Sequence, residues 1–255
     1  MNNYKIILQY DGTRYRGWQS LGDTEQTIQG KLQNVLSRLN GGPVAVIGSG
    51  RTDAGVHASG QTANFCLSET WEEDVLRAEL NRYLPEDIAV LRAERVGERF
   101  HSRYQAKSKT YLYRIDTGEV ADVFKRRYVY HYPIALDASR MRRAAELLIG
   151  THDFRSFCGN KKMKKSAVRT LSEITIAKKE QELQIFYTGN GFLQNMVRIL
   201  TGTLIEIGDG RREPEEIEQI LAAKERACAG YTAPACGLTL LEVTYGEEEA
   251  WKNGS

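Results

Sequence analysis

Residues 48–58 read GSGRTDAGVHA and combine three glycines, one arginine, one carboxylate and one histidine in a single short run. The preceding residues 44–47, VAVI, are apolar and rich in β-branched side chains, which predicts a buried strand. The chain would then leave this strand and present Asp53 beside Arg51 on a glycine-rich loop. Loops carried on a rigid strand often hold binding or catalytic groups. Glycine and aspartate are also ordinary residues of surface turns, so local composition leaves both interpretations open.

Two nucleotide-binding motifs come close to matching this region, and both fail. The dinucleotide pattern G-x-G-x-x-G begins at Gly48 but meets Asp53 where its third glycine should allow close helix–strand packing. The phosphate-loop pattern begins at Gly55 but has Gln61 in place of the lysine that reaches the phosphates. The remaining feature is a carboxylate held in a tight loop beside a positive charge.

The composition is that of an ordinary globular protein, with 255 residues, of which 41% are hydrophobic and 27% are charged. This length suits one large domain or two smaller ones. No apolar run approaches the roughly 18 residues that a membrane helix needs, and the first residues contain no apolar signal core. We therefore expect a cytoplasmic protein.

The cysteines and histidines show no pattern that is typical of a metal site or a disulfide framework. The four cysteines form no C-x-x-C pair, and the four histidines have no ligand spacing. We expect reduced thiols and no bound metal.

Charge is unevenly distributed, although the net charge is only +2. Basic residues are frequent over 92–127 and again over 161–169, whereas acidic residues gather at 213–216 and 246–249. A basic face on a nearly neutral protein suits a polyanion such as nucleic acid. Most charge runs are merely solvated surfaces, so this pattern alone does not establish a partner.

The first part of the chain predicts the element order β-α-β-β-α-β, which is typical of a ferredoxin-like unit. Apolar residues at helical spacing indicate two helices, and Thr27 and Thr70 are their expected N-caps. The expected elements are strand 4–10, helix 27–39, strand 44–47, strand 61–67, helix 71–83 and strand 88–92.

The second part roughly repeats this order after a basic linker at 100–108. The expected elements are strand 109–115, a short extended run at 129–132, helix 137–149, a hairpin of strands 171–177 and 182–189, helix 192–207, helix 214–223 and strand 238–245. We therefore predict an N-terminal half at 1–104, which carries the Asp53 loop, and a C-terminal half at 105–247.

Five short motifs occur in order along the chain and are considered together as a set. They are Tyr10-Asp11-Gly12-Thr13 with Tyr15 and Gly17-Trp18-Gln19, the run 50–58, Tyr111-Leu112-Tyr113, the run 152–157, and Met196-Val197-Arg198. Together they resemble the TruA family of tRNA pseudouridine synthases over nearly the whole chain. Two departures, Ser20 and Cys236, lie outside the catalytic set.

This resemblance implies an α+β pseudouridine synthase fold. Two ferredoxin-like halves would join through a mainly antiparallel sheet with flanking helices and a central catalytic cleft. It also implies a homodimeric isomerase that needs no cofactor or metal and converts uridine to pseudouridine at positions 38, 39 and 40 of the tRNA anticodon stem-loop. The reaction breaks the C1′–N1 bond, rotates the flipped base and rejoins it through C5. It needs one carboxylate, unlike glycoside hydrolysis, and must exclude water.

By the same resemblance, Asp53 is the nucleophile and Arg198 is the basic residue that pairs with it and keeps it ionised. Attack at C1′ and a glycal route both remain open. Tyr111 corresponds to the tyrosine that stacks on the target base and is a candidate to take the C5 proton. Arg51 corresponds to the arginine that enters the stem. Without the resemblance, a tyrosine on an alternating strand is usually a core residue, and we expect His57 to hydrogen-bond its own loop.

Basic side chains near the expected cleft are predicted to contact tRNA phosphates. They are Arg103, Lys107, Lys109, Lys161, Lys162, Lys164, Lys165 and Arg169. An RNA-binding module without chemistry would use the same basic and aromatic residues, but it would not need Asp53. A related synthase that acts at another RNA position is the second alternative.

Overall fold

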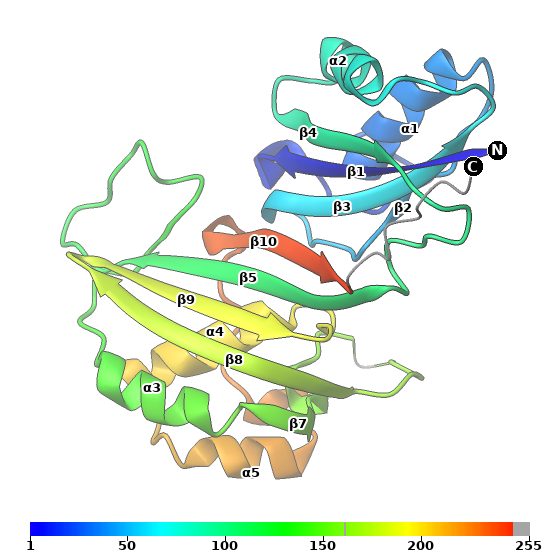
Figure 1. Ribbon diagram of the computed structural model, residues 1–255. Coiled ribbons are helices and arrows are strands. Elements are labelled where there is room, and N and C mark those ends of the chain that lie inside the picture. Colours follow the sequence, from blue (N-terminus) through cyan, green and yellow to red (C-terminus); the bar gives the residue numbers. More distant parts are fainter. Residues whose placement is uncertain (161, 247–255) are drawn as a thin grey trace.

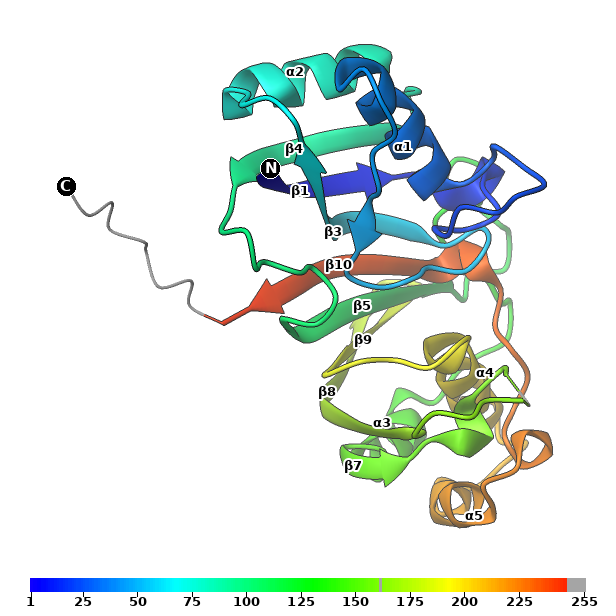
Figure 2. The ribbon, with the colours of Figure 1, turned by 90° about the vertical axis from the view of Figure 1, so that its right-hand side faces the viewer.

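The computed structural model describes residues 1–160 and 162–246, which form one mixed, mainly antiparallel sheet with helices at both ends (Figure 1). The strand order is β4-β1-β3-β10-β5-β9-β8-β7, with β2 paired to β3 and β6 paired to β5. Figure 2 shows the strands of both halves stacked in one series with β10 near its centre. The predicted α+β class with a mainly antiparallel sheet is confirmed.

The first half contains β1 (Asn2–Tyr10), α1 (Ile28–Leu39), β2 (Ile47–Gly48), β3 (His57–Leu67), α2 (Glu73–Tyr83) and β4 (Ile88–Arg95). Tyr4, Ile6 and Leu8 are buried at alternate positions of β1, as the period of a strand requires. The expected cap of α1 is confirmed, because the Thr27 side chain accepts a hydrogen bond from the backbone N–H of Gly30.

The second half contains β5 (Ala106–Asp116), β6 (Tyr130–His131), α3 (Ala138–Glu146), β7 (Gly150–Asp153), β8 (Val168–Lys179), β9 (Glu182–Gly189), α4 (Met196–Gly208), α5 (Glu216–Ala223) and β10 (Leu238–Tyr245). Its strands β10-β5-β9-β8 lie in the same relative order as β4-β1-β3-β2 of the first half. The two halves therefore share the ferredoxin-like strand order.

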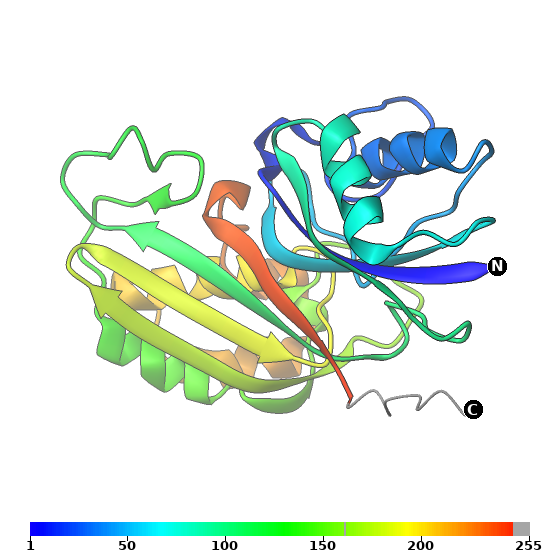
Figure 3. The same ribbon diagram turned by 45° about the horizontal axis from the view of Figure 1, so that its top comes forward.

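Strand β10 joins the two halves (Figure 3). It pairs antiparallel with β5 along most of its length and parallel with β3 at only two positions, Thr239 with His57 and Leu240 with Ala58. The far end of β3 pairs with β2 instead. One end of β3 therefore pairs with the second half, and its other end pairs with β2 of the first half.

Several expected boundaries were wrong. The strand expected at 44–47 is reduced to Ile47–Gly48, although Val44 and Val46 are buried, because burial without a paired neighbour does not make a strand. The strand expected at 61–67 begins four residues earlier, at His57, where β10 supplies a partner. The four-residue strand β7 was missed; it lies at the edge of the sheet, against β8.

Four expected helices are shorter than their apolar patterns. Helix α2 begins after Glu72, so the expected cap Thr70 lies outside it. Helix α4 begins after Asn195, whose backbone has φ of +59° and interrupts the pattern that starts at Phe192. Helix α3 ends at Glu146 rather than Ile149, and α5 begins at Glu216 rather than Pro214. Phe192 and Leu193, before α4, are apolar because they pack against the core, without being helical.

Candidate active site

The backbone of the Asp53 loop is clamped by the segment that follows β1. The N–H of Trp18 donates to the carbonyl of Thr52 at 3.0 Å, and the N–H of Gly55 donates to the carbonyl of Tyr15 at 3.3 Å. Gly17 has φ of +94°, and a Cβ there would lie 2.6 Å from the Thr52 carbonyl oxygen. A glycine is required at this position because the two backbones approach so closely. The first motif of the sequence therefore holds the loop in place.

A buried polar network lies beneath the same loop. The Tyr10 hydroxyl is 2.8 Å from Thr52 Oγ1, and the Ser49 hydroxyl donates to Gln61 Oε1 at 2.6 Å. Gln61 Nε2 in turn donates to the carbonyl of Gly50 at 3.2 Å. Burial raises the pKa of Tyr10 to about 12, so its hydroxyl stays protonated. These contacts fix the loop on both sides of Arg51.

Asp53 and Arg198 form the ion pair that was expected. Arg198 Nη1 lies 3.6 Å from Asp53 Oδ2, and the two side chains are 18% and 29% exposed. Burial raises the pKa of Asp53 above its ordinary value, while the positive charge of Arg198 and a backbone hydrogen bond from Asn195 act in the opposite direction. Pairing with Arg198 therefore offsets part, but not all, of the free-energy cost of burying the ionised Asp53 carboxylate. That Arg198 keeps Asp53 ionised stays a prediction.

The guanidinium of Arg198 has two further partners that fix its direction. Its Nε donates to the carbonyl of Ala233 at 2.7 Å, and its Nη1 donates to Asn195 Oδ1 at 3.1 Å. The carbonyl of Arg198 also accepts from the N–H of Ala233 at 3.1 Å. A planar fork with several donors suits such a site better than a lysine would.

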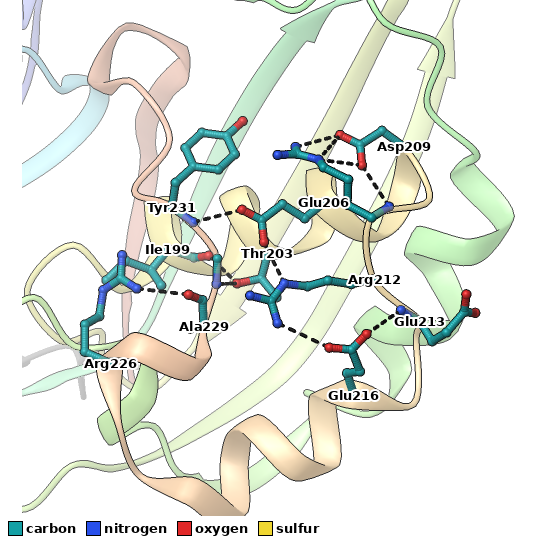
Figure 4. Close-up of polar contacts among 12 residues, drawn as sticks. Ile199, Thr203, Glu206, Asp209, Arg212, Glu213, Glu216, Arg226, Ala229 and Tyr231 are labelled. Atoms are coloured by element: carbon teal, nitrogen blue, oxygen red, sulfur yellow. Dashed lines mark hydrogen bonds and ion pairs between the residues drawn. The ribbon is translucent and has the colours of Figure 1, made fainter.

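The segment 229–233 that holds Arg198 is itself fastened to α4 (Figure 4). The N–H of Gly230 donates to Thr203 Oγ1 at 2.9 Å, and the N–H of Tyr231 donates to Glu206 Oε1 at 3.3 Å. The Glu206 carboxylate also accepts from Arg212 Nε at 2.6 Å. These hydrogen bonds fix the segment 229–233 on α4, and this segment in turn holds the Arg198 guanidinium in place.

Tyr111 lies on β5 between its neighbours Leu240 on β10 and Tyr187 on β9. It is 7% exposed, and its ring meets the edge of Phe192 with centroids 5.0 Å apart. Burial, then the nearby Tyr10 and Asp53, raise the pKa of Tyr111. Leu240 also pairs with Ala58, at the end of the run 48–58, so Tyr111 lies in the same row of the sheet as the end of that run, although its burial resembles that of a core residue.

The expected basic residues fall into two groups. Lys109 donates to the carbonyl of Ser49 at 2.8 Å, and burial, with Arg103 and Arg169 nearby, lowers its pKa to about 8. Three cations therefore gather next to the start of the catalytic loop. The side chains of Arg51, Arg103, Lys107, Lys162, Lys164 and Lys165 are exposed, whereas Lys161 lies outside the described residues.

His57 has a structural partner, but not the expected one. Its Nδ1 accepts from the N–H of Gly12 at 3.1 Å and lies 3.3 Å from Asp11 Oδ1, so it ties the catalytic loop to the first turn rather than to itself. Burial lowers the pKa of His57. A neutral imidazole that accepts a backbone hydrogen bond fits that position.

Metal and membrane features can be stated for the part of the chain that the structure describes. There, no group of three or more His, Cys, Asp or Glu side chains is arranged to hold a metal ion. Within residues 1–160 and 162–246, no helix is long and apolar enough to cross a membrane. The expected independence from metals and cofactors stays a prediction.

A family profile for tRNA pseudouridine synthases matches residues 6–105 and 144–246, which include Asp53 and Arg198. The chain belongs to this family. Related tRNA pseudouridine synthase A proteins from Bacillus sp. KSM-64, Clostridium tetani and Brevibacillus brevis are 49%, 46% and 45% identical to it. Each similarity spans 96% of this chain and 100% of the relative.

One solved structure, of a Cbf5-Nop10-Gar1 complex, matches with a TM-score of 0.41 and 10% identity. The match covers 95% of this chain and 50% of that one. The tRNA pseudouridine synthase family membership and the observed sheet confirm the fold class inferred from the motifs.

Sequence reasoning missed the residues that support the tRNA pseudouridine synthase site. Tyr10 and Gly17 belong to a quoted motif, but no role was assigned to them. Gln61 was considered only as a failed phosphate-loop residue, and Ala233 was not considered. Ala233 acts through backbone atoms, so its side chain carries no signal of this role.

Proposed function

We propose that this protein converts uridine to pseudouridine in tRNA, with Asp53 as the nucleophile. The observation that carries the proposal is one carboxylate paired with a fixed arginine and placed beside a buried tyrosine. Glycosidic-bond isomerisation needs one such carboxylate. The closely related tRNA pseudouridine synthases support tRNA as the substrate.

The reaction follows from these groups. The C1′–N1 bond breaks and its electron pair leaves with the uracil, while Asp53 assists either by attack at C1′ or by removing a proton from C2′. The detached base rotates within the site, and its C5 then bonds to C1′. In the first route the Asp53–C1′ bond breaks as this bond forms, and in the second Asp53 returns the proton to C2′. The C5 proton then leaves and N1 gains a proton, so that the net change is an isomerisation. We assign to the Tyr111 ring the stacking surface for the base and to its phenol, which the raised pKa keeps protonated, the relay of the C5 proton.

The finer features of the proposal concern the RNA and the assembly. The targets are uridines 38, 39 and 40 in the anticodon stem-loop. Arg51 fills the space left by the flipped nucleotide, and Arg103, Lys107, Lys109, Lys161, Lys162, Lys164, Lys165 and Arg169 contact phosphates. The protein is a cytoplasmic homodimer without cofactor, with halves at 1–104 and 105–247. The gathering of Arg103, Lys109 and Arg169 beside the catalytic loop supports the phosphate contacts.

The proposal is tested with tRNA that carries tritium at C5 of uridine, because isomerisation releases that hydrogen. Wild type should release tritium at positions 38–40. Asp53→Asn should lose at least about 10⁴-fold in rate, the scale seen when a nucleophile is removed, while its tRNA affinity stays near wild type. Retained turnover in this variant would eliminate Asp53 as the nucleophile. Tight binding without turnover by wild type would favour the RNA-binding module.

A further inference from the structure

The connection between β4 and β5, on the right in Figure 1, carries an aromatic pair formed by half-buried His101 and exposed Tyr104. The rings of His101 and Tyr104 stack with centroids 4.1 Å apart and an interplanar angle of 29°. Tyr104 is 80% exposed, although a large aromatic side chain normally buries most of its surface. One face of its ring rests on His101, and the rest is open to solvent.

This pair is held rigidly by its own turn. The His101 Nδ1 accepts the backbone N–H groups of Arg103 and Tyr104 at 3.2 Å and 3.3 Å. Gln105 closes the turn, because its Oε1 accepts from the N–H of His101 at 3.0 Å and its N–H donates to the His101 carbonyl at 3.2 Å. The His101 imidazole therefore supports the turn, and these hydrogen bonds fix the ring on which Tyr104 stacks.

The turn is anchored to both halves of the protein through Ser102, which is fully buried. The Ser102 hydroxyl donates to the carbonyl of Ile47 at 2.5 Å, and its N–H donates to Asn64 Oδ1 at 2.9 Å. The hydroxyl of Tyr245, at the end of β10, donates to the Ser102 carbonyl at 2.7 Å. An exposed aromatic side chain on so firmly fixed a backbone is preorganised for a ligand.

Charge around the turn indicates the kind of ligand. Arg103, between the two rings in sequence, is close enough to lower the pKa of Lys109, which itself contacts the start of the Arg51 loop. The Ser102 hydroxyl binds Ile47 and Lys109 binds Ser49, so the turn that carries Tyr104 and the buried cation both contact the chain at the start of the Asp53 loop. An aromatic platform beside cations that track a phosphate backbone is the usual means of binding unpaired nucleotides.

We infer that Tyr104, supported by His101, is a stacking platform for an unpaired base of the substrate RNA, separate from the Tyr111 site. This inference rests on the proposed function for the identity of the RNA. It requires only RNA binding, so it can be tested independently of the chemistry. Arg103 supplies the charge beside the platform, and Tyr104 supplies the stacking surface.

The test measures tRNA dissociation constants in an Asp53→Asn background, where the bound RNA stays unmodified. Tyr104→Ala should weaken binding by about tenfold, the scale of one lost base stack. Tyr104→Phe and Tyr104→Trp should bind within about twofold of the parent, whereas Tyr104→Leu should resemble Tyr104→Ala. Tyr83→Ala is the matched control and should change nothing, because Tyr83 is also exposed and next to an arginine, on the remote helix α2.

Salt dependence separates stacking from charge. Tyr104→Ala should keep the salt slope of the parent, whereas Arg103→Ala should reduce it by about 1. The inference is overturned if Tyr104→Leu binds like the parent, if Tyr104→Ala has no effect, or if Tyr104→Ala changes the mass measured by light scattering, which would indicate contact with a second copy of the chain. Wild-type tritium release is measured in parallel. Its absence would reject the proposed reaction while leaving the binding comparison intact.

Discussion

Replacing Arg198 by glutamine tests how the carboxylate at the site is kept reactive. The variant removes the positive charge 3.6 Å from Asp53 and retains an amide that can still reach a neighbouring carbonyl. Burial already raises the pKa of Asp53, and Arg198 is the main opposing influence. Loss of that charge should therefore raise the pKa further and reduce the ionised fraction of Asp53 at any acidic or neutral pH.

The size of the effect follows from the geometry of the pair. Two unit charges at 3.6 Å interact by about 5 kcal/mol at an effective dielectric constant of about 20, and by about 1 kcal/mol in bulk water. Both groups are partly exposed, so we take about 1 to 3 kcal/mol after allowing for solvent screening. This corresponds to a loss of about tenfold to a hundredfold in kcat/KM on the acidic side of the profile.

The assay is the pH dependence of kcat/KM for tritium release between about pH 5 and pH 9. Activity of Arg198→Gln should recover as the pH rises, because Asp53 becomes ionised again. Arg198→Lys is the matched control: it keeps the charge but cannot donate to Ala233, Asn195 and Asp53 from one plane, so its acid limb should move less. An acid limb that stays in place in Arg198→Gln would refute the role assigned to the pair.

Three further outcomes are expected. Asp53→Asn should melt at a higher temperature than wild type at pH 7. Because the pKa of Asp53 is raised in the folded protein, its ionised form costs stability once the pH rises above the pKa of the unfolded chain, near 3.8. The difference in melting temperature, measured by calorimetry, should therefore shrink on acidification. Tyr111→Phe keeps the packing on Phe192 but loses the hydroxyl, so kcat should fall by about a hundredfold or more with KM nearly unchanged in steady-state assays. Lys109 has a pKa lowered to about 8, so the salt slope of tRNA binding should decrease by about 1 between pH 7 and pH 9 in wild type, and Lys109→Met should not show this change.

The sequence predicted strands best where apolar residues alternate along a segment that also pairs with a neighbouring strand. The expected strands 182–189 and 238–245 match β9 and β10, and Thr27 caps α1 as predicted. These features depend on local alternation and local hydrogen bonds, which the sequence expresses directly. Element ends were less predictable, because residues such as Phe192 are apolar for packing while Asn195 prevents the helix from starting there.

The site was predictable from motifs but not from local physics. Asp53 and Arg198 are far apart in sequence, and only the resemblance to a family brought them together. Without it, Tyr111 has the pattern of an ordinary core residue, and its burial in the structure agrees with that pattern. The groups that orient Arg198, in contrast, are a backbone carbonyl at Ala233 and a left-handed residue at Asn195. The contact with Ala233 leaves no side-chain signal in the sequence, whereas the contact with Asn195 uses its side-chain Oδ1.

The join between the halves explains why these distant residues meet. In β3, Ala58 pairs with Leu240 of β10, and Leu240 pairs with Tyr111 of β5. One row across three strands therefore connects the end of the Asp53 loop to Tyr111. A Cβ at Gly60 would lie 2.1 Å from the carbonyl oxygen of Leu241, so β3 and β10 can approach this closely only because that position is glycine. The parallel pairing is short, but it begins four residues after Asp53. Its register thus helps to set the distance between Asp53 and Tyr111, and a slip of one residue between β3 and β10 would shift the Asp53 loop relative to Tyr111.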